Sequence, residues 1–305
     1  DPVSELVPVR PAQHYSMGGI RTRPNGESAN LKGLFSCGEA ACWDMHGFNR
    51  LGGNSVAETV VAGMIVGEYM ADFCDSAESD IDISTSQVAG FIKREQQSID
   101  SLLASKGTEC APDILREMQT LMTDKVGIFR THEQLQAAVE QLQVLHARSN
   151  NIGLSSHSAA VNPELVTAYR LRRMLKLALC VTHGALQRTE SRGAHFREDF
   201  PERNDRDWLR RTLASWPDSD QLLPTLVYEE LNVMSMELPP GWRGYGAKDY
   251  IEHPDTASRQ AEIEQLKRKM PDADRYEIQH ALMQYEELLP ERYRGRNQRL
   301  GDDDE

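Results

Sequence analysis

The clearest hydrophobic pattern in this chain starts at Asn54, where apolar side chains begin to recur every three or four residues. This is the period of an amphipathic helix. The expected stripe contains Val56, Val60, Met64 and Gly67, widened by Val61, Ile65 and Tyr69. Two segments precede this expected helix. They are a short apolar run with strand character, residues 34–37, and a polar loop that ends in Gly52 and Gly53. The pattern therefore predicts a strand, a glycine-bearing loop and a long helix.

Four more segments with a helical period follow the polar break at residues 74–80. They begin at Ser84, Pro112, Thr131 and Asn162, residue types that favour a helix start. Thr131 and Gln134 also have the spacing of a capping box. The first helix is expected to bury Val88, Phe91, Ile92, Ile99, Leu102 and Leu103, and the last to bury Leu165, Val166, Tyr169, Met174, Leu177, Cys180 and Val181. We predict that the four helices form an antiparallel bundle.

The chain after the bundle reads differently. Asp205 is expected to cap a short helix that contains Trp208, and a β-like run follows Pro224. Beyond residues 239–242 the sequence resembles an extended arm, in which Asp274 would cap a last amphipathic helix. We therefore predict three regions: an α/β segment at 1–76, an all-α helical bundle at 77–220 and a C-terminal extension or arm at 221–305.

Composition narrows the function classes. The chain has 305 residues and a net charge of −13, which argues against nucleic-acid binding. Its five cysteines form no CxxC pair, so neither a zinc site nor an iron–sulfur cluster is expected within the chain, and no metal site is predicted. No apolar run reaches the ~20 residues of a membrane-spanning helix.

Arg50 is the first candidate for chemistry, because it lies just before the glycine pair and the helix start. An arginine at that point can hold a carboxylate through two parallel hydrogen bonds. The N-terminus of the following helix also favours an anion. A second candidate is the charged segment 190–205, in which Arg192, His195 and Arg197 alternate with acids. A catalytic cluster is conceivable there, but a charge network that fastens the bundle to the preceding domain is the favoured interpretation.

Three sequence motifs occur in the order known from one enzyme family. They are HYSMGGI at residues 14–20, GLFSCGEAACW at 33–43 with HGFNRLGGNSVAE at 46–58, and ESRGAHFREDFPERND at 190–205. The chain resembles the flavoprotein subunit of succinate dehydrogenase and fumarate reductase, particularly the form in menaquinol-linked fumarate reductases. The resemblance implies that region 1–76 is the C-terminal part of an FAD-binding domain.

The resemblance also implies roles for individual residues. His14 matches the family's histidine that hydrogen-bonds a carboxylate of the dicarboxylate substrate, and Arg50 matches its substrate-holding arginine. Glu39 matches the glutamate that accepts a hydrogen bond from a hydroxyl of FAD. Ser55 and Val56 match the helix-start residues whose backbone faces the flavin ring. His46 is ambiguous: it either braces the loop or touches the flavin, and bracing is favoured.

Other parts of the family's machinery have no counterpart in this sequence. The dinucleotide-binding motif, the histidine that carries FAD covalently and the proton-donating arginine of the capping domain are expected upstream, so no catalytic residue is assigned here. We expect the chain to be the C-terminal portion of a larger flavoprotein that interconverts fumarate and succinate. Its expected partners are an iron–sulfur subunit and a membrane cytochrome b-type anchor with menaquinone, at the cytoplasmic face of the bacterial inner membrane.

Two alternatives stay open at this stage. An L-aspartate oxidase-type flavoenzyme is the first, although that family has Arg-Met-Ala-Ser where this chain has Arg50, Leu51, Gly52 and Gly53. The second is a non-catalytic assembly domain, should the chain exist alone. A flavin absorption band in purified material would separate the second alternative from an enzyme.

Overall fold

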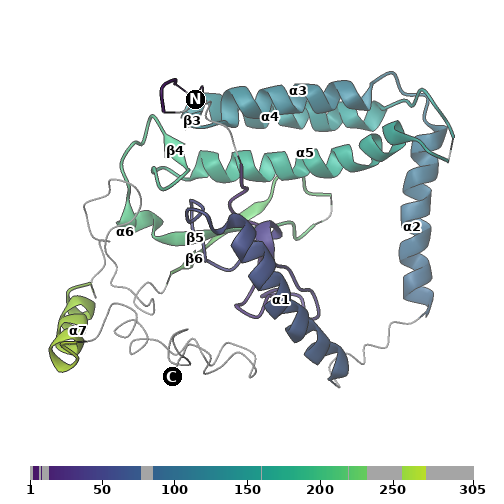
Figure 1. The fold of residues 1–305 in the computed structure, drawn as a ribbon. Helices are drawn as coiled ribbons and strands as arrows, with labels where there is room; N and C mark the ends of the chain where they lie inside the picture. The colour runs from purple at the N-terminus through teal and green to yellow at the C-terminus, as the bar shows by residue number, and fades with distance from the viewer. Residues whose placement is uncertain are drawn as a thin grey trace. The chain divides into compact units, whose positions relative to one another are not determined.

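The described residues of the computed structural model are rich in helix and contain three small two-stranded sheets (Figure 1). The structure describes residues 3–6, 8, 14–76, 85–158, 160–218, 220–231 and 256–272. The chain divides into two compact units. Unit 1 comprises residues 1–81 and 279–305, and unit 2 comprises residues 82–278.

Unit 1 is built on a short parallel pair and one long helix. Strand β1 (Ile20–Arg21) pairs with β2 (Ala41–Cys42), and the 3-10 helix η1 (Gly38–Ala40) precedes β2. The strand predicted at residues 34–37 is not formed, because β1 pairs with the chain after η1 instead. Phe35 makes only an isolated bridge to Glu27.

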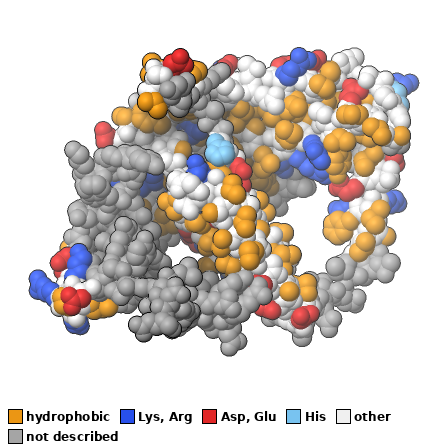
Figure 2. Space-filling model, in the orientation of Figure 1, with side chains coloured by type: hydrophobic (Ala, Val, Ile, Leu, Met, Phe, Trp, Pro, Cys, Tyr) orange, Lys and Arg blue, Asp and Glu red, His pale blue; other side chains and the backbone are white. Residues whose placement is uncertain are grey.

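The helix predicted from Asn54 is confirmed as α1 (Asn54–Asp75), but unit 1 buries a different face of it. The buried row is Glu58, Ala62 and Val66, whereas the predicted stripe is largely exposed (Val56, Val60, Val61 and Met64). The turn at residues 23–26 packs on the buried row so closely that a Cβ at Gly26 would lie 2.4 Å from a Val66 methyl. Figure 2 shows hydrophobic side chains over α1 on the face turned to the viewer.

Unit 2 has its core between three long helices, α3 (Ala111–Val126), α4 (His132–Arg148) and α5 (Pro163–Gln187). These helices begin where the sequence predicted. The fully buried side chains of the core include Ile114, Leu135, Leu142, Leu171, Leu175 and Leu179. Helix α2 (Thr85–Ala104) packs on this core with Leu102 and Leu103 only, and Phe91 near its other end is 61% exposed. The predicted burial of Val88, Phe91 and Ile92 was therefore wrong within unit 2, and Ser84 lies outside the described residues.

The sequence also predicted the wrong buried face for α5. Leu177 is 61% exposed, and Val166 and Val181 are also exposed, whereas Ala168, Leu171, Leu175, Ala178, Leu179, Ala185 and Leu186 are buried. Both sides of this helix are apolar, so periodicity alone does not select one of them. The buried side contains the alanines, and small residues let the backbones of two neighbouring helices come close.

The predicted helix starts differ in their details. Asn162 Oδ1 accepts a hydrogen bond from Leu165 N at 3.1 Å, and Thr131 Oγ1 accepts one from Gln134 N at 3.3 Å. The reciprocal bond of the capping box is missing, because Gln134 Oε1 is buried without a partner among the described residues. The short helix α6 (Asp205–Trp208) is capped by Asn204, so the predicted Asp205 cap was wrong.

The bundle is not purely helical, which corrects the predicted all-α description. Strand β3 (Phe129–Arg130) pairs in parallel with β4 (Phe196–Arg197). A hairpin joins β5 (Arg210–Ser215) to β6 (Thr225–Glu230), with Arg210 opposite Glu230. Strand β6 confirms the β-like run after Pro224, but β5 was missed. Helix α7 (Thr256–Lys269) was also missed, and the helix expected at Asp274 lies outside the described residues.

Candidate functional site

The loop before α1 leads to a helix start that is open on one side. Gly53 has φ +75°, a left-handed conformation that favours glycine, and a Cβ built on it would meet no atom of the described residues within 4 Å. The first N–H groups of a helix have no partner within it, so this end carries a partial positive charge. Ser55 and Val56 lie in the first turn, and the Val56 side chain is 72% exposed.

Arg50 is held beside this helix start by one weak contact. Its Nη1 donates to Ser55 Oγ at 3.5 Å, the only hydrogen bond that its side chain makes among the described residues. The guanidinium therefore keeps most of its five N–H donors for a ligand. The structure thus brings Arg50 and Ser55 together, and the ligand contacts expected of both residues stay predictions.

Glu39 and His14 come from segments that precede the Arg50 loop in the chain. Glu39 lies in η1, and its Oε1 accepts a hydrogen bond from the backbone N of Ser16 at 2.6 Å. This bond ties the segment that carries His14 to η1. His14 itself is exposed, and no hydrogen bond joins it to Arg50 within the described part of the chain. The ligand contacts expected of His14 and Glu39 stay predictions.

His46 braces the loop, as the favoured interpretation expected. Its Nδ1 accepts a hydrogen bond from the backbone N of Leu51 at 3.4 Å, and its ring packs edge-on against Tyr15 at 5.4 Å between centroids. The Nε2 atom of the same ring is buried without a partner among the described residues.

Sequence reasoning missed Glu58, which is only 4% exposed. Its two oxygens accept hydrogen bonds from Tyr15 Oη at 3.2 Å and from Trp43 Nε1 at 3.1 Å. Burial, followed by the charge of Glu58, raises the pKa of Tyr15 to about 12. The sequence did contain a signal for its burial. Glu58 precedes Ala62 by four residues and Val66 by eight, so the three residues lie on one side of the helix.

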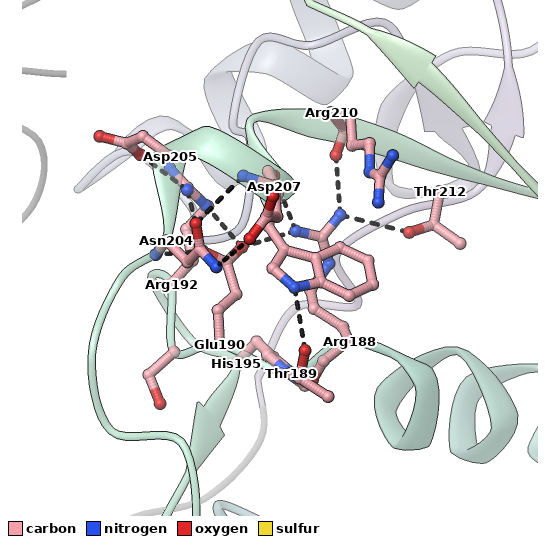
Figure 3. Close-up of polar contacts among 12 residues, drawn as sticks. Arg188, Thr189, Glu190, Arg192, His195, Asn204, Asp205, Asp207, Arg210 and Thr212 are labelled. Atoms are coloured by element: carbon pink, nitrogen blue, oxygen red, sulfur yellow. Dashed lines mark hydrogen bonds and ion pairs between the residues drawn. The ribbon is translucent and has the colours of Figure 1, made fainter. Parts of the chain in front are cut away.

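The charged segment 190–205 forms a buried network in unit 2 (Figure 3). Glu190 is fully buried and accepts hydrogen bonds from Arg188, from Arg192 and from the backbone N of Asn204. Such a carboxylate has its hydrogen-bonding capacity used within the protein, which favours a structural role over a catalytic one.

Arg197 in the same segment is also fully buried. Its Nη1 donates to the carbonyl oxygens of Ala185, Leu186 and Arg188, and its Nε and Nη2 bind the Asp199 carboxylate. The guanidinium lowers the pKa of Asp199 to about 2. These contacts attach the segment to the C-terminal end of α5, so the network interpretation holds within unit 2. Its predicted link to the preceding domain stays a prediction.

Two negative findings concern the described residues alone. None of their helices is both long enough and apolar enough to cross a membrane. No group of three or more histidine, cysteine, aspartate or glutamate side chains among them is arranged to hold a metal ion.

Two family models match the chain. One is described as an FAD binding domain and matches residues 1–56, which include Glu39, Arg50, Ser55 and Val56. The other is described as the C-terminal part of fumarate reductase flavoprotein and matches residues 115–245.

Named relatives agree with these matches. The fumarate reductase flavoprotein subunit of Helicobacter pylori is 54% identical over 301 residues, which cover 98% of this chain and 42% of that protein. The succinate dehydrogenase flavoprotein subunit of Rickettsia bellii is 34% identical, over 80% of this chain and 42% of that protein. The FrdA chain of Escherichia coli quinol fumarate reductase superimposes with a TM-score of 0.73 and 36% identity, over 81% of this chain and 41% of that chain. This chain thus spans less than half the length of each.

Proposed function

Because the chain belongs to the flavoprotein-subunit family of fumarate reductases and succinate dehydrogenases, we propose that the whole protein interconverts fumarate and succinate with FAD. The observation that carries the proposal is the position of Arg50, a cation with free donors beside the open N-terminus of α1. FAD, when bound, would supply the acceptor and donor of a hydride. The residues of this chain would bind and orient the substrate.

Arg50 would hold one carboxylate of the substrate through two parallel hydrogen bonds. His14, on the segment tied down by Glu39, would donate a hydrogen bond to a substrate carboxylate. A dicarboxylate held at two points loses most of its rotational freedom before reaction, and its developing charge meets fixed donors. The proton donor is proposed to be an arginine outside this chain.

The residues at the start of α1 fit a bound flavin. Ser55 and Val56 would present backbone N–H groups toward it, and the positive end of the helix would stabilise negative charge on the reduced flavin. Glu39 would accept a hydrogen bond from an FAD hydroxyl, because its carboxylate has acceptor capacity beyond the single bond to Ser16.

The proposal extends to the surroundings of the protein. FAD would be attached covalently to a histidine outside this chain. Electrons would pass to or from menaquinone through an iron–sulfur subunit and a membrane cytochrome b-type subunit, at the cytoplasmic face of the inner membrane. The similarity to a quinol fumarate reductase chain supports an assembly of this kind.

The test is a substrate comparison with the purified whole protein. We expect fumarate to oxidise a reduced viologen dye in its presence, succinate to reduce an oxidised dye, and L-aspartate to cause no oxygen uptake. Aspartate-dependent oxygen uptake without fumarate turnover would instead establish the aspartate oxidase alternative. Protein that carries no flavin and turns over none of these substrates would contradict both enzyme assignments.

A further inference from the structure

Three separate parts of unit 1 meet at the carboxylate of Glu58. Tyr15 comes from the segment before β1, Trp43 from the loop after β2, and Glu58 from the second turn of α1. Tyr15 is 43 residues and Trp43 is 15 residues away from Glu58 along the chain. Each carboxylate oxygen accepts one hydrogen bond from a protein donor. Because Glu58 is only 4% exposed, its carboxylate has little access to water.

Each of the three parts carries a residue of the proposed site. Tyr15 is the immediate neighbour of His14, and Trp43 lies in the loop that leads to Arg50. Glu58 follows Ser55 by one turn on the same helix. The hydrogen bonds of Glu58 therefore act on the segments that carry the two expected substrate residues.

A second set of contacts connects Tyr15 with the end of the Arg50 loop. The ring of Tyr15 meets the His46 ring edge-on, with an interplanar angle of 81°. His46 in turn accepts a hydrogen bond from the backbone N of Leu51, the residue after Arg50. A displacement of the Tyr15 ring would thus disturb both His14 and the peptide bond that follows Arg50.

We propose that Glu58 is a positioning residue for the dicarboxylate site, because it sets the separation between His14 and Arg50 through Tyr15 and Trp43. This inference rests on the proposed function. A substrate with two carboxylates needs its two binding groups at a fixed separation, and a misplacement of about 1 Å can reduce the rate about 100-fold.

The test uses the purified whole protein with its flavin and two single variants. Glu58→Gln keeps the side-chain size but removes the charge and turns one acceptor into an amide donor, which cannot pair with the Trp43 indole N–H and can meet the Tyr15 hydroxyl only with that hydrogen bond reversed. Tyr15→Phe removes only the hydroxyl. The control is Asp72→Asn, which changes an exposed carboxylate on the same helix. For each variant we would measure bound flavin, Tm, and kcat and KM for fumarate and for succinate.

We expect Glu58→Gln and Tyr15→Phe to lower kcat/KM about 10- to 100-fold, partly through a raised KM, while bound flavin stays at the wild-type level. Asp72→Asn should match the wild type. A lowered Tm with wild-type kcat/KM per bound flavin would overturn the proposal, because Glu58 would then only stabilise the fold. Should Glu58→Gln fail to fold, Tyr15→Phe decides in the same way.

The double variant adds a second criterion. If the two residues act through one hydrogen bond, Glu58→Gln combined with Tyr15→Phe should lower kcat/KM no further than the more damaging single variant does. Multiplying losses would overturn the proposed path from Glu58 through Tyr15. A failure of the proposed function is distinguishable, because the wild-type protein itself would then turn over neither fumarate nor succinate.

Discussion

At the scale of single residues, hydrogen bonding separates a structural arginine from a binding one. Arg197 is fully buried and donates to three carbonyl oxygens and one carboxylate. Arg50 makes one long bond within the described residues and lies beside an open helix start. A guanidinium whose donors are all used supports the fold, whereas one with free donors is available for an anion.

We predict that Arg50→Ala in the whole protein abolishes fumarate turnover while flavin stays bound. A charge-assisted bidentate contact that tightens in the transition state should contribute a factor of about 10² to 10⁴ in rate. Arg50→Lys should restore little of this, because an ammonium does not reproduce the planar fork of donors. Steady-state kinetics with flavin content measured on the same samples is the check. Near wild-type kcat/KM in Arg50→Ala would remove this residue from the site.

His195 makes a prediction about pH. Its pKa is lowered to about 4, first by burial and then by the charge of Arg130, while the hydrogen bond with the backbone carbonyl of Arg188 opposes this shift. The unfolded chain therefore binds this proton near pH 6.5 and the folded chain only near pH 4. Stability should be full above pH 6.5 and fall by about 3 kcal/mol as the pH drops to 4.

Urea unfolding of the chain at pH 7, 5.5 and 4.5, followed by circular dichroism, measures this loss. In His195→Gln the part of the stability loss that is due to His195 should disappear. The free energy of unfolding should therefore change less between pH 6.5 and 4 than in the wild type. An equally steep profile in the variant would assign the loss to other groups.

At the scale of secondary-structure elements, α1 and α5 show why helix bounds are easier to predict than helix faces. Both helices start where the sequence indicated, because glycine, asparagine and proline act locally on the first turn. Both also carry apolar residues on more than one side. The buried side is the one that other segments cover, and those segments are distant in sequence.

We predict that Asn162→Ala destabilises unit 2 by about 1 kcal/mol, since α5 would lose its N-cap bond to Leu165 N. The amide nitrogen of Asn162 also donates to the carbonyl oxygens of Ser156 and Ser158. Asn162→Asp keeps the capping oxygen but replaces these two donors with a carboxylate oxygen that the two carbonyl oxygens repel, so it tests the amide group as a whole. Urea unfolding of both variants gives the two values, and equal stability of Asn162→Ala and the wild type would contradict the role of the cap.

At the scale of the whole molecule, the two units differ in how well they bury their apolar residues. Unit 2 has a continuous core between α3, α4 and α5. Among the described residues of unit 1 the buried hydrophobic side chains are Ala62 and Val66, whereas Val56, Val60, Val61 and Met64 of α1 are exposed. Among the described residues, unit 2 therefore has the continuous hydrophobic core of an independent domain, whereas unit 1 does not.

We predict that residues 1–305 expressed alone bind FAD weakly or not at all and do not reduce fumarate. Only Glu39 and the start of α1 are proposed to contact flavin here, and a tightly bound cofactor of this size usually has most of its surface buried. Titration of FAD into the chain, followed by flavin fluorescence, is the measurement. Micromolar or tighter binding with fumarate turnover would show that these residues form a complete site.

We predict further that residues 82–231 fold without unit 1, because the fully buried side chains of α3, α4 and α5 contact one another. Circular dichroism during thermal unfolding should show a cooperative transition of helical protein. The control is the Leu142→Ala variant of this fragment, in which a buried core leucine is truncated. Its free energy of unfolding should be lower by about 2–5 kcal/mol. Gradual melting without a transition in the parent fragment would contradict an independent core.

The sequence by itself determined the features that depend on neighbouring residues. The helix starts at Asn54, Thr131 and Asn162 follow from local residue types and spacing. The motifs also gave the family and hence the candidate residues His14, Glu39, Arg50, Ser55 and Val56. Local propensity and spacing carry this information without reference to the fold.

Only the tertiary structure decided which apolar side of α1 and α5 is buried and which groups pair within the charged segment 190–205. The hydrogen bonds of Glu58 join residues 15, 43 and 58, and strand β5 exists because β6 pairs with it. A periodic pattern records spacing along one helix, whereas burial depends on segments that return from far along the chain. A carboxylate such as that of Glu58 can be buried only where donors from distant parts of the chain form hydrogen bonds with it. A local sequence pattern does not show whether such donors are present.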